Sequence, residues 1–278
     1  MHRRSEPCQH RAHHDDGGAA GRIASRADRS RRARRVWGLL TAAATFSAAL
    51  IAVPAAEPSL AVVPDADPAV ASCAPLDVVF VVDTTGSMGP AIDNVKEQIV
   101  ELTHEIEQVS GGDYRIGLVE FRDHITVTSA FAAGNAEQMR DEVATLSASG
   151  GGGSPEAWDE ALVTVVEERS AARTANDSGR SGAQTGDFDV PWRDEAEKIV
   201  LLITDATPAG FDDEYDVEDQ DRAYAAAVKA KERDIRIATV FVPNGNQEDD
   251  APYFLQFVAG LTHSTHFATD QEGSNLAE

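Results

Sequence analysis

Short apolar runs alternate with segments of helical periodicity along the second half of the chain. A continuous valine-rich run such as Leu76–Val82 (LDVVFVV) is typical of a strand buried on both faces. A short turn at Arg122–His124 separates two neighbouring runs, which we expect to pair as a local antiparallel hairpin. Strands are predicted at Leu76–Val82, Tyr114–Phe121, Ile125–Phe131, Lys198–Thr204, Ile235–Val242 and His266–Ala268.

Between these runs, apolar residues recur every three or four positions, as in helices that bury one face. The clearest stripe consists of Ile92, Val95, Ile99, Leu102 and Ile106. Further helices are predicted at Asn135–Leu146, Pro155–Glu168, Asp221–Glu232 and Pro252–Leu261. The alternation predicts an α/β fold, with a doubly wound, mainly parallel sheet and helices on both of its faces.

Three polar stretches interrupt this pattern. Residues 170–191 join the end of a helix to the start of a strand, and we expect a disordered insertion there with no role in the site. The acid-rich run Asp212–Asp221 follows the end of a strand, where a solvated surface is the ordinary interpretation. Residues 274–278 begin in the manner of a helix cap, so a final, truncated helix is expected.

Charge divides the chain into a basic head and an acidic body. The net charge is −23, yet residues 1–35 contain ten arginines and four acidic residues. The uncharged, apolar stretch Val36–Val53 follows, and small residues after it offer cleavage sites. This order favours a basic leader with a removed signal peptide at 1–61, a Pro/Ala-rich linker at 62–73 and a folded domain at 74–278. An uncleaved membrane anchor remains the alternative.

The composition excludes several classes of protein. With 42% hydrophobic and 26% charged residues, the bulk of the chain is neither disordered, collagen-like nor a disulfide scaffold. The acidic body would repel nucleic acid and anionic lipid, so neither is expected as a partner, and the mature domain does not insert into membranes unless the leader is retained. We expect a secreted or cell-envelope protein. Cys73 is the single cysteine after the leader, either as a free thiol or paired with a cysteine beyond Glu278.

Hydroxyl and carboxylate side chains gather where strands end. They lie in the loop from Asp83 to Met88, in the glycine loop from Gly150 to Glu156, and at Thr204–Asp205. Ligands of open α/β sheets bind at this edge. Because the set contains oxygen donors only, it suits one hard divalent cation, Mg²⁺ first, with Mn²⁺ or Ca²⁺ as alternatives. Taken separately, each loop has a simpler interpretation, as a helix cap, a flexible turn or a turn residue.

These residues resemble the von Willebrand factor type A family. The resemblance rests on Val78–Met88 (VVFVVDTTGSM), a following helix, a glycine loop and Leu201–Pro208 (LLITDATP). It runs from about Leu76 to the C-terminus. The phrases at Gly117–Asp123, Gly150–Glu156 and Trp192–Asp205 are similar to the hemicentin-like branch of bacteria and animals.

The resemblance implies a metal-ion-dependent adhesion site. Asp83, Thr85 and Ser87 match its first loop, with Thr85 where serine is usual, and Asp205 matches its third loop. Ser154 stands where the second loop usually supplies threonine or aspartate. In such sites the ion keeps one position open for a carboxylate of a partner protein.

The resulting hypothesis is an exported, non-enzymatic adhesion module that grips an acidic group of a protein ligand through one divalent cation. We expect the acid-rich run to strengthen cation capture. The alternative is a scaffold domain with a structural ion, inside a larger envelope protein. A third hypothesis is a phosphoaspartyl phosphatase-like enzyme with Asp83 as nucleophile, which the absence of an aspartate at Thr85 disfavours. His263 and His266 are interpreted as surface or turn residues.

Overall fold

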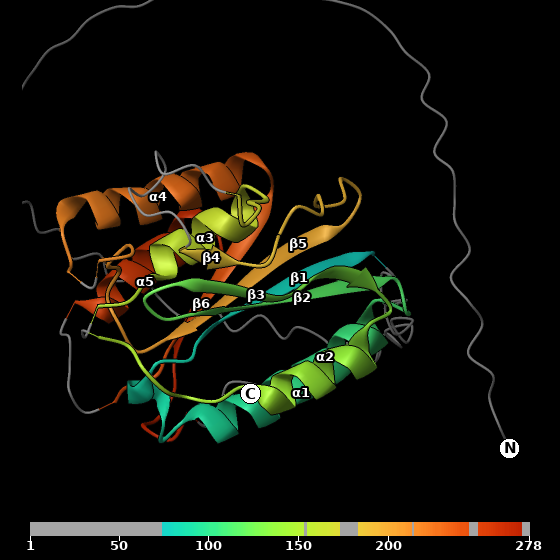
Figure 1. Cartoon of the computed structure of the whole chain (residues 1–278). Helices are drawn as coiled ribbons and strands as arrows, with labels where there is room; N and C mark the ends of the chain where they lie inside the picture. Colours follow the sequence, from blue (N-terminus) through green and yellow to red (C-terminus); the bar gives the residue numbers. More distant parts are fainter. Residues whose placement is uncertain (1–73, 153–154, 173–182, 213, 245–249, 274–278) are drawn as a thin grey trace, which may run out of the picture. The chain divides into compact units, whose positions relative to one another are not determined.

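Seven strands form one mixed sheet in the order β4-β3-β2-β1-β5-β6-β7 (Figure 1). The computed structural model describes residues 74–152, 155–172, 183–212, 214–244 and 250–273. The predicted leader, the linker, Cys73 and residues 274–278 lie outside them. The strands are β1 (Leu76–Asp83), β2 (Tyr114–Phe121), β3 (Ile125–Ala133), β4 (Gln184–Thr185), β5 (Glu197–Thr204), β6 (Ile235–Phe241) and β7 (His266–Ala268).

The predicted antiparallel hairpin and mainly parallel sheet are both confirmed. β1 lies between β2 and β5 and is parallel to both, and β6 and β7 continue the parallel side. Only the β2–β3 hairpin is antiparallel. All of β1 after Leu76 is buried, because this central strand faces helices on both sides.

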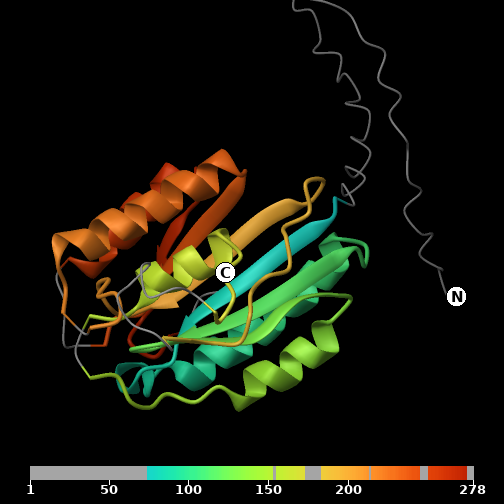
Figure 2. The ribbon, with the colours of Figure 1, turned by 45° about the horizontal axis from the view of Figure 1, so that its top comes forward.

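Helices cover both faces of the sheet (Figure 2). On one face α1 and α2 pack against Val78, Phe80 and Val82 of β1. On the other, α3, α4 and α5 enclose a second core that contains Val79 and Val81. The alternation of β1 side chains therefore divides the molecule into two cores, and the doubly wound α/β fold is confirmed. The helices are α1 (Ile92–Val109), α2 (Ala136–Thr145), α3 (Trp158–Val166), α4 (Val217–Glu232) and α5 (Ala251–Leu261).

The expectation of a disordered insertion at 170–191 is wrong for its second half. Gln184–Thr185 forms the edge strand β4, parallel to β3. Phe188 is completely buried, and its ring meets Phe131 edge-on at a centroid distance of 5.2 Å. A two-residue polar strand carries no hydrophobic period, so the sequence pattern gave no signal for it. Residues 173–182 of this stretch lie outside the described part.

The acid-rich run is only partly a surface loop. α4 begins at Val217, four residues earlier than predicted, because Asp216 and Asp219 form a reciprocal capping box. The Asp216 carboxylate accepts from the Asp219 backbone N–H at 3.0 Å, and Asp219 accepts from the Asp216 backbone N–H at 2.9 Å. Acidic residues in a first helical turn also suit the helix dipole.

A buried ion-pair network fixes the other end of β1. The carboxylate of Asp77 is fully buried and accepts from Arg115 Nε and Arg193 Nε, both at 2.9 Å. The Arg115 and Arg193 partners hold the pKa of Asp77 below its usual value, although burial alone would raise it. Within the described ranges, no helix is long and apolar enough to cross a bilayer.

Candidate metal centre

The first loop closes on itself through side-chain oxygens. Thr85 donates to Asp83 Oδ1 with both its backbone N–H, at 2.9 Å, and its hydroxyl, at 2.6 Å. Ser87 Oγ lies 2.9 Å from Thr85 Oγ1. The simpler interpretation as a cap fails for Thr85, because its side chain makes no cap hydrogen bond and the N-cap of α1 is Ala91. The three oxygens therefore form one cluster, as their alternation predicted.

The end of β5 brings a second carboxylate to this cluster. Thr204 donates its hydroxyl to Asp83 Oδ2 at 2.7 Å, and Asp205 follows immediately. Asp205 Oδ2 accepts from Asn244 Nδ2 at 2.9 Å. Its Oδ1 is buried and has no hydrogen-bond partner within the described ranges. A buried acceptor without a donor is costly, so this oxygen is available to a cation or a hydrogen-bond donor.

Burial disfavours the charged form of both carboxylates. Burial and the negative charge of Asp205 raise the pKa of Asp83 to about 7, although three hydrogen bonds oppose the rise. Burial also raises the pKa of Asp205, and the Asn244 amide offsets only part of it. Neither carboxylate pairs with a lysine or arginine among the residues the structure describes. A divalent cation would supply the positive charge that the protein does not.

The glycine loop packs directly on the first loop. Gly86 N–H donates to Gly150 O at 2.8 Å, and Gly151 adopts a positive φ of 84°. A Cβ at Gly151 would lie 2.9 Å from Glu156 Oε1 and 3.1 Å from Thr85 Cβ, so only glycine fits there. Ser154, the expected ligand of this loop, lies outside the described residues.

Glu156 is a site residue that the sequence analysis did not single out. Its side chain is buried, and one carboxylate oxygen lies beside Gly151. Its backbone bonds to the third loop in both directions, through Thr207 O at 2.9 Å and the Ala209 N–H at 3.0 Å. These bonds also explain why α3 begins at Trp158 and not at the predicted Pro155. Glu156 therefore ties the glycine loop to the third loop.

A four-residue cluster supports the third loop from beneath. Arg222 of α4 contacts Asp159 at 2.8 Å, Glu160 at 3.1 Å and Asp219 at 2.8 Å. Asp159 Oδ1 in turn accepts the Gly210 N–H at 3.1 Å. Burial raises the pKa of Asp159 to about 7, even though Arg222 opposes the rise. One arginine thus contacts three carboxylates that support the loop carrying Asp205.

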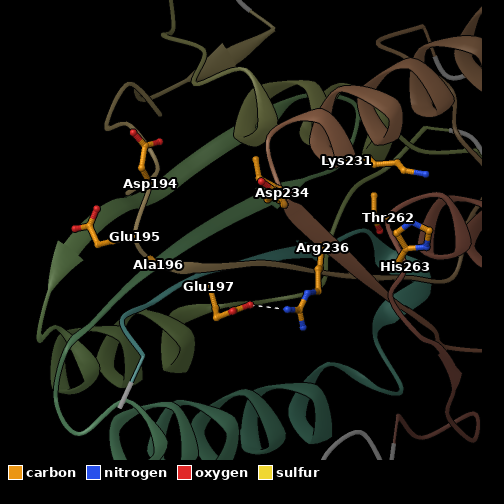
Figure 3. Close-up of a pocket in the computed structure, with 10 residues that line it drawn as sticks. Asp194, Glu195, Ala196, Glu197, Lys231, Asp234, Arg236, Thr262 and His263 are labelled. Atoms are coloured by element: carbon orange, nitrogen blue, oxygen red, sulfur yellow. Dashed lines mark hydrogen bonds and ion pairs between the residues drawn. The ribbon is translucent and has the colours of Figure 1, made fainter. Parts of the chain in front are cut away.

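A hollow lined by charged side chains lies at the opposite edge of the sheet, where β5 and β6 begin. Its volume is about 580 Å³, and its walls come from the start of β5 and β6 and the ends of α4 and α5. Figure 3 shows its charged lining, with Glu197 and Arg236 paired at 2.5 Å. Because none of the oxygen cluster lies there, the hollow is separate from the candidate centre.

The oxygen cluster fits a hard cation. It offers two buried carboxylates, one with a free lone pair, and two hydroxyls, with neither imidazole nor thiolate. Within the described ranges, no three His, Cys, Asp or Glu side chains gather as a metal-binding group. The cluster has two carboxylates, so its remaining donors would be hydroxyls.

Comparison with known proteins gives the family. The von Willebrand factor type A domain matches residues 77–278, and the chain belongs to this family. Domains of this family are generally non-enzymatic modules that bind proteins, often together with a divalent cation. No curated protein matches the sequence.

Several solved structures are similar at low identity. They include the conserved hypothetical protein BatB from Bacteroides thetaiotaomicron, at 14% identity and a TM-score of 0.49, over 72% of this chain and 92% of that one. A von Willebrand factor type A protein from Catenulispora acidiphila has 15% identity and a TM-score of 0.49, over 70% and 39%. The manganese-loaded TRAP protein of Plasmodium vivax has 18% identity and a TM-score of 0.47, over 72% and 70%.

Proposed function

We propose that the chain is an exported adhesion module, of the hemicentin-like branch, that binds a protein ligand through one divalent cation. Asp83, Thr85, Ser87, Ser154 and Asp205 would hold the ion. The observation that carries the proposal is the pair of buried carboxylates, Asp83 and Asp205, which lie against a hydroxyl cluster and pair with no lysine or arginine of the described residues. Mg²⁺ suits these donors first, with Mn²⁺ or Ca²⁺ as alternatives.

Charge arithmetic explains how the ion would serve binding. Two ionised carboxylates neutralise one divalent cation, and the bound ion supplies a Lewis-acidic position for a further oxygen ligand. An aspartate or glutamate of the partner is the natural donor, because a charged oxygen gains most from a cation in a partly dry crevice. The many exposed acidic residues at this edge of the sheet would repel partner proteins whose surfaces carry further negative charge.

The residues around the cluster would preorganise it. Thr204 fixes Asp83, Asn244 fixes Asp205, and Glu156 ties the glycine loop to the third loop. Such supporting contacts hold ligands in place when a metal is bound. Export of the chain is part of the proposal and rests on the arginine-rich head and the uncharged stretch Val36–Val53.

The proposal is tested with Mn²⁺ as a spectroscopic probe on the purified chain. Free Mn²⁺ is followed by electron paramagnetic resonance in the wild type, in Asp83→Ala and in Asp205→Ala. Asp141→Asn, an exposed change on α2, is the matched control. We expect one saturable site in the wild type and the control, competed by Mg²⁺, and loss of this site in both site variants.

A second readout separates adhesion from a structural ion. Water-proton relaxation of the Mn²⁺-loaded chain reports on water bound to the ion, and acetate at millimolar concentration serves as the carboxylate probe. A fall in relaxation on adding acetate supports an open coordination position. Saturable Mn²⁺ binding with no response to acetate would instead support the scaffold alternative.

A further inference from the structure

Exposed apolar side chains concentrate on one pair of helices. Seven large apolar residues in the described ranges are exposed, and five of them belong to α4, to α5 or to the segment just before α4. Three of the four tyrosines of the chain also lie there. Scattered apolar residues are ordinary on a protein surface, whereas a contiguous group marks an interaction site. We call this group the aromatic patch: Tyr215, Val217, Tyr224, Val228, Tyr253 and Phe257.

Helical spacing and ring contacts make the patch continuous. Val217, Tyr224 and Val228 are separated by seven and four positions, so they share one face of α4. Tyr253 and Phe257 are four apart on α5, which packs beside α4 (Figure 1). The rings of Tyr224 and Phe257 join the two helices at a centroid distance of 4.4 Å.

The patch contains a hollow large enough to admit an apolar side chain. Its volume is about 390 Å³, and Tyr253, Phe257 and Leu261 form its apolar wall. Tyr253 is 61% exposed and Phe257 is 41% exposed, so both rings are open to a partner. Tyrosine and phenylalanine supply large, rigid contact surfaces, which is why interfaces are enriched in them.

The charge around the patch selects the chemistry of the partner. Exposed carboxylates of Asp212, Glu214, Glu218, Asp221 and Asp250 flank its end near the starts of α4 and α5. Only Asp216 and Asp219 of this acidic region are used to cap α4. Lys231 lies at the other end, beside the hollow. The patch is therefore acidic at one end and basic at the other. The acidic end carries more charges, so it would attract a basic group of a partner.

We propose that the aromatic patch is a second binding surface, which takes a basic segment of a partner protein. An apolar side chain of that segment fills the hollow beside Tyr253 and Phe257. Its lysine or arginine side chains lie over Tyr215 and among the acidic residues, where both the ring face and the carboxylates attract a cation. The folded domain of a second copy does not fit, because residues 62–278 contain 14 basic and 42 acidic residues and would be repelled. Binding at this surface does not require the metal ion, so this proposal concerns a second site, separate from the proposed adhesion site.

The test uses a random peptide library displayed on phage, selected on the full chain in EDTA. EDTA removes any divalent ion, so failure here and failure of the metal proposal are distinguishable. Selected peptides are then made synthetically and measured by fluorescence polarisation. The wild type is compared with Tyr253→Ser/Phe257→Ser and with a matched control, Phe267→Ser, which removes an exposed ring from β7. Circular dichroism checks that each variant is folded, and the single change Val228→Ser replaces the double variant if it is not.

We expect selected peptides that carry net positive charge and at least one large apolar residue. The patch variant should bind them at least about tenfold more weakly, and the control within about twofold of the wild type. Raising the salt from 50 to 500 mM should weaken binding, because the charges are exposed and salt screens their attraction. The screening length falls from about 10 Å at 0.1 M to about 3 Å at 1 M. Selection of acidic or uncharged peptides, no selection at all, or equal binding by the patch variant would overturn the proposal.

Discussion

Arg222 should be essential to stability at neutral and higher pH. Its guanidinium contacts the carboxylates of Asp159, Glu160 and Asp219, whose side chains are 0%, 1% and 6% exposed. Substitution by methionine keeps the packing of the stem but leaves three buried carboxylates without a counter-charge. Breaking a buried pair from one side costs about 3–5 kcal/mol, so Arg222→Met should lose this amount at pH 8.

The loss should depend on pH in a defined direction. In the wild type, Asp159 is protonated below about pH 7 in the folded state and ionised above about pH 4 in the unfolded chain. Folding therefore takes up a proton in this window, and stability falls by about 1.4 kcal/mol per pH unit as the pH rises through it. Above pH 7 this contribution levels off. Arg222→Met removes the charge that lowers the pKa of Asp159, so this pKa should rise further. The stability of the variant should therefore continue to fall above pH 7.

Urea unfolding of the two proteins at pH 6, 7 and 8 measures the effect. Arg236→Met is the matched control, since it breaks an exposed pair with Glu197 and should cost less than about 1 kcal/mol. The double change Asp159→Asn/Arg222→Met should regain part of the loss and flatten the pH profile. A cost below about 1 kcal/mol for Arg222→Met at pH 8, or the same cost at pH 6 and 8, would refute the reasoning.

Three further predictions concern the site and the opposite end of β1. Gly151→Ala should weaken Mg²⁺ binding, because the new Cβ would collide with Glu156 and Thr85. Gly150→Ala should keep Mg²⁺ binding, because its Cβ would meet only Arg122 Cδ, at 3.9 Å. Calorimetric titration of both variants distinguishes a steric effect from backbone strain. In EDTA, the thermal unfolding midpoint should fall as the pH rises from 5 through about 7, because the Asp83 carboxyl ionises in the folded state over this range. Mg²⁺ should raise the midpoint more at pH 8 than at pH 6. An equal effect of Mg²⁺ at the two pH values would contradict this prediction. Asp77→Ala should cost about 3 kcal/mol in urea unfolding, because it leaves Arg115 and Arg193 without their shared carboxylate, and a cost under 1 kcal/mol would count against it.

Much of the fold was predictable because apolar periodicity records burial directly. The bounds of β2 and β7 match the prediction, and those of β1 and β6 differ by a single residue. The misses have local causes. β4 is short and polar, and the start of α4 lies inside an acidic run whose capping role a charge count does not show.

The candidate site was predictable where a short segment defines it and not where loops meet. Asp83, Thr85 and Ser87 alternate in one loop, and their mutual contacts follow from that spacing. Glu156 and Asn244 join the site through tertiary contacts between loops distant in sequence. Glu156 stands inside the glycine loop that the sequence analysis quoted, and its carboxylate next to a glycine run was the available signal. The assignment of Ser154 stays a prediction.

The central claim is that Asp83 and its neighbours bind one divalent cation. Isothermal calorimetry of Mg²⁺ binding to the wild type and to Asp83→Ala, at pH 8 and so above the pKa of about 7 of Asp83, tests this claim most directly. The account predicts a single saturable site in the wild type that disappears in the variant. Absence of saturable binding in the wild type, or the same binding in both proteins, would contradict it.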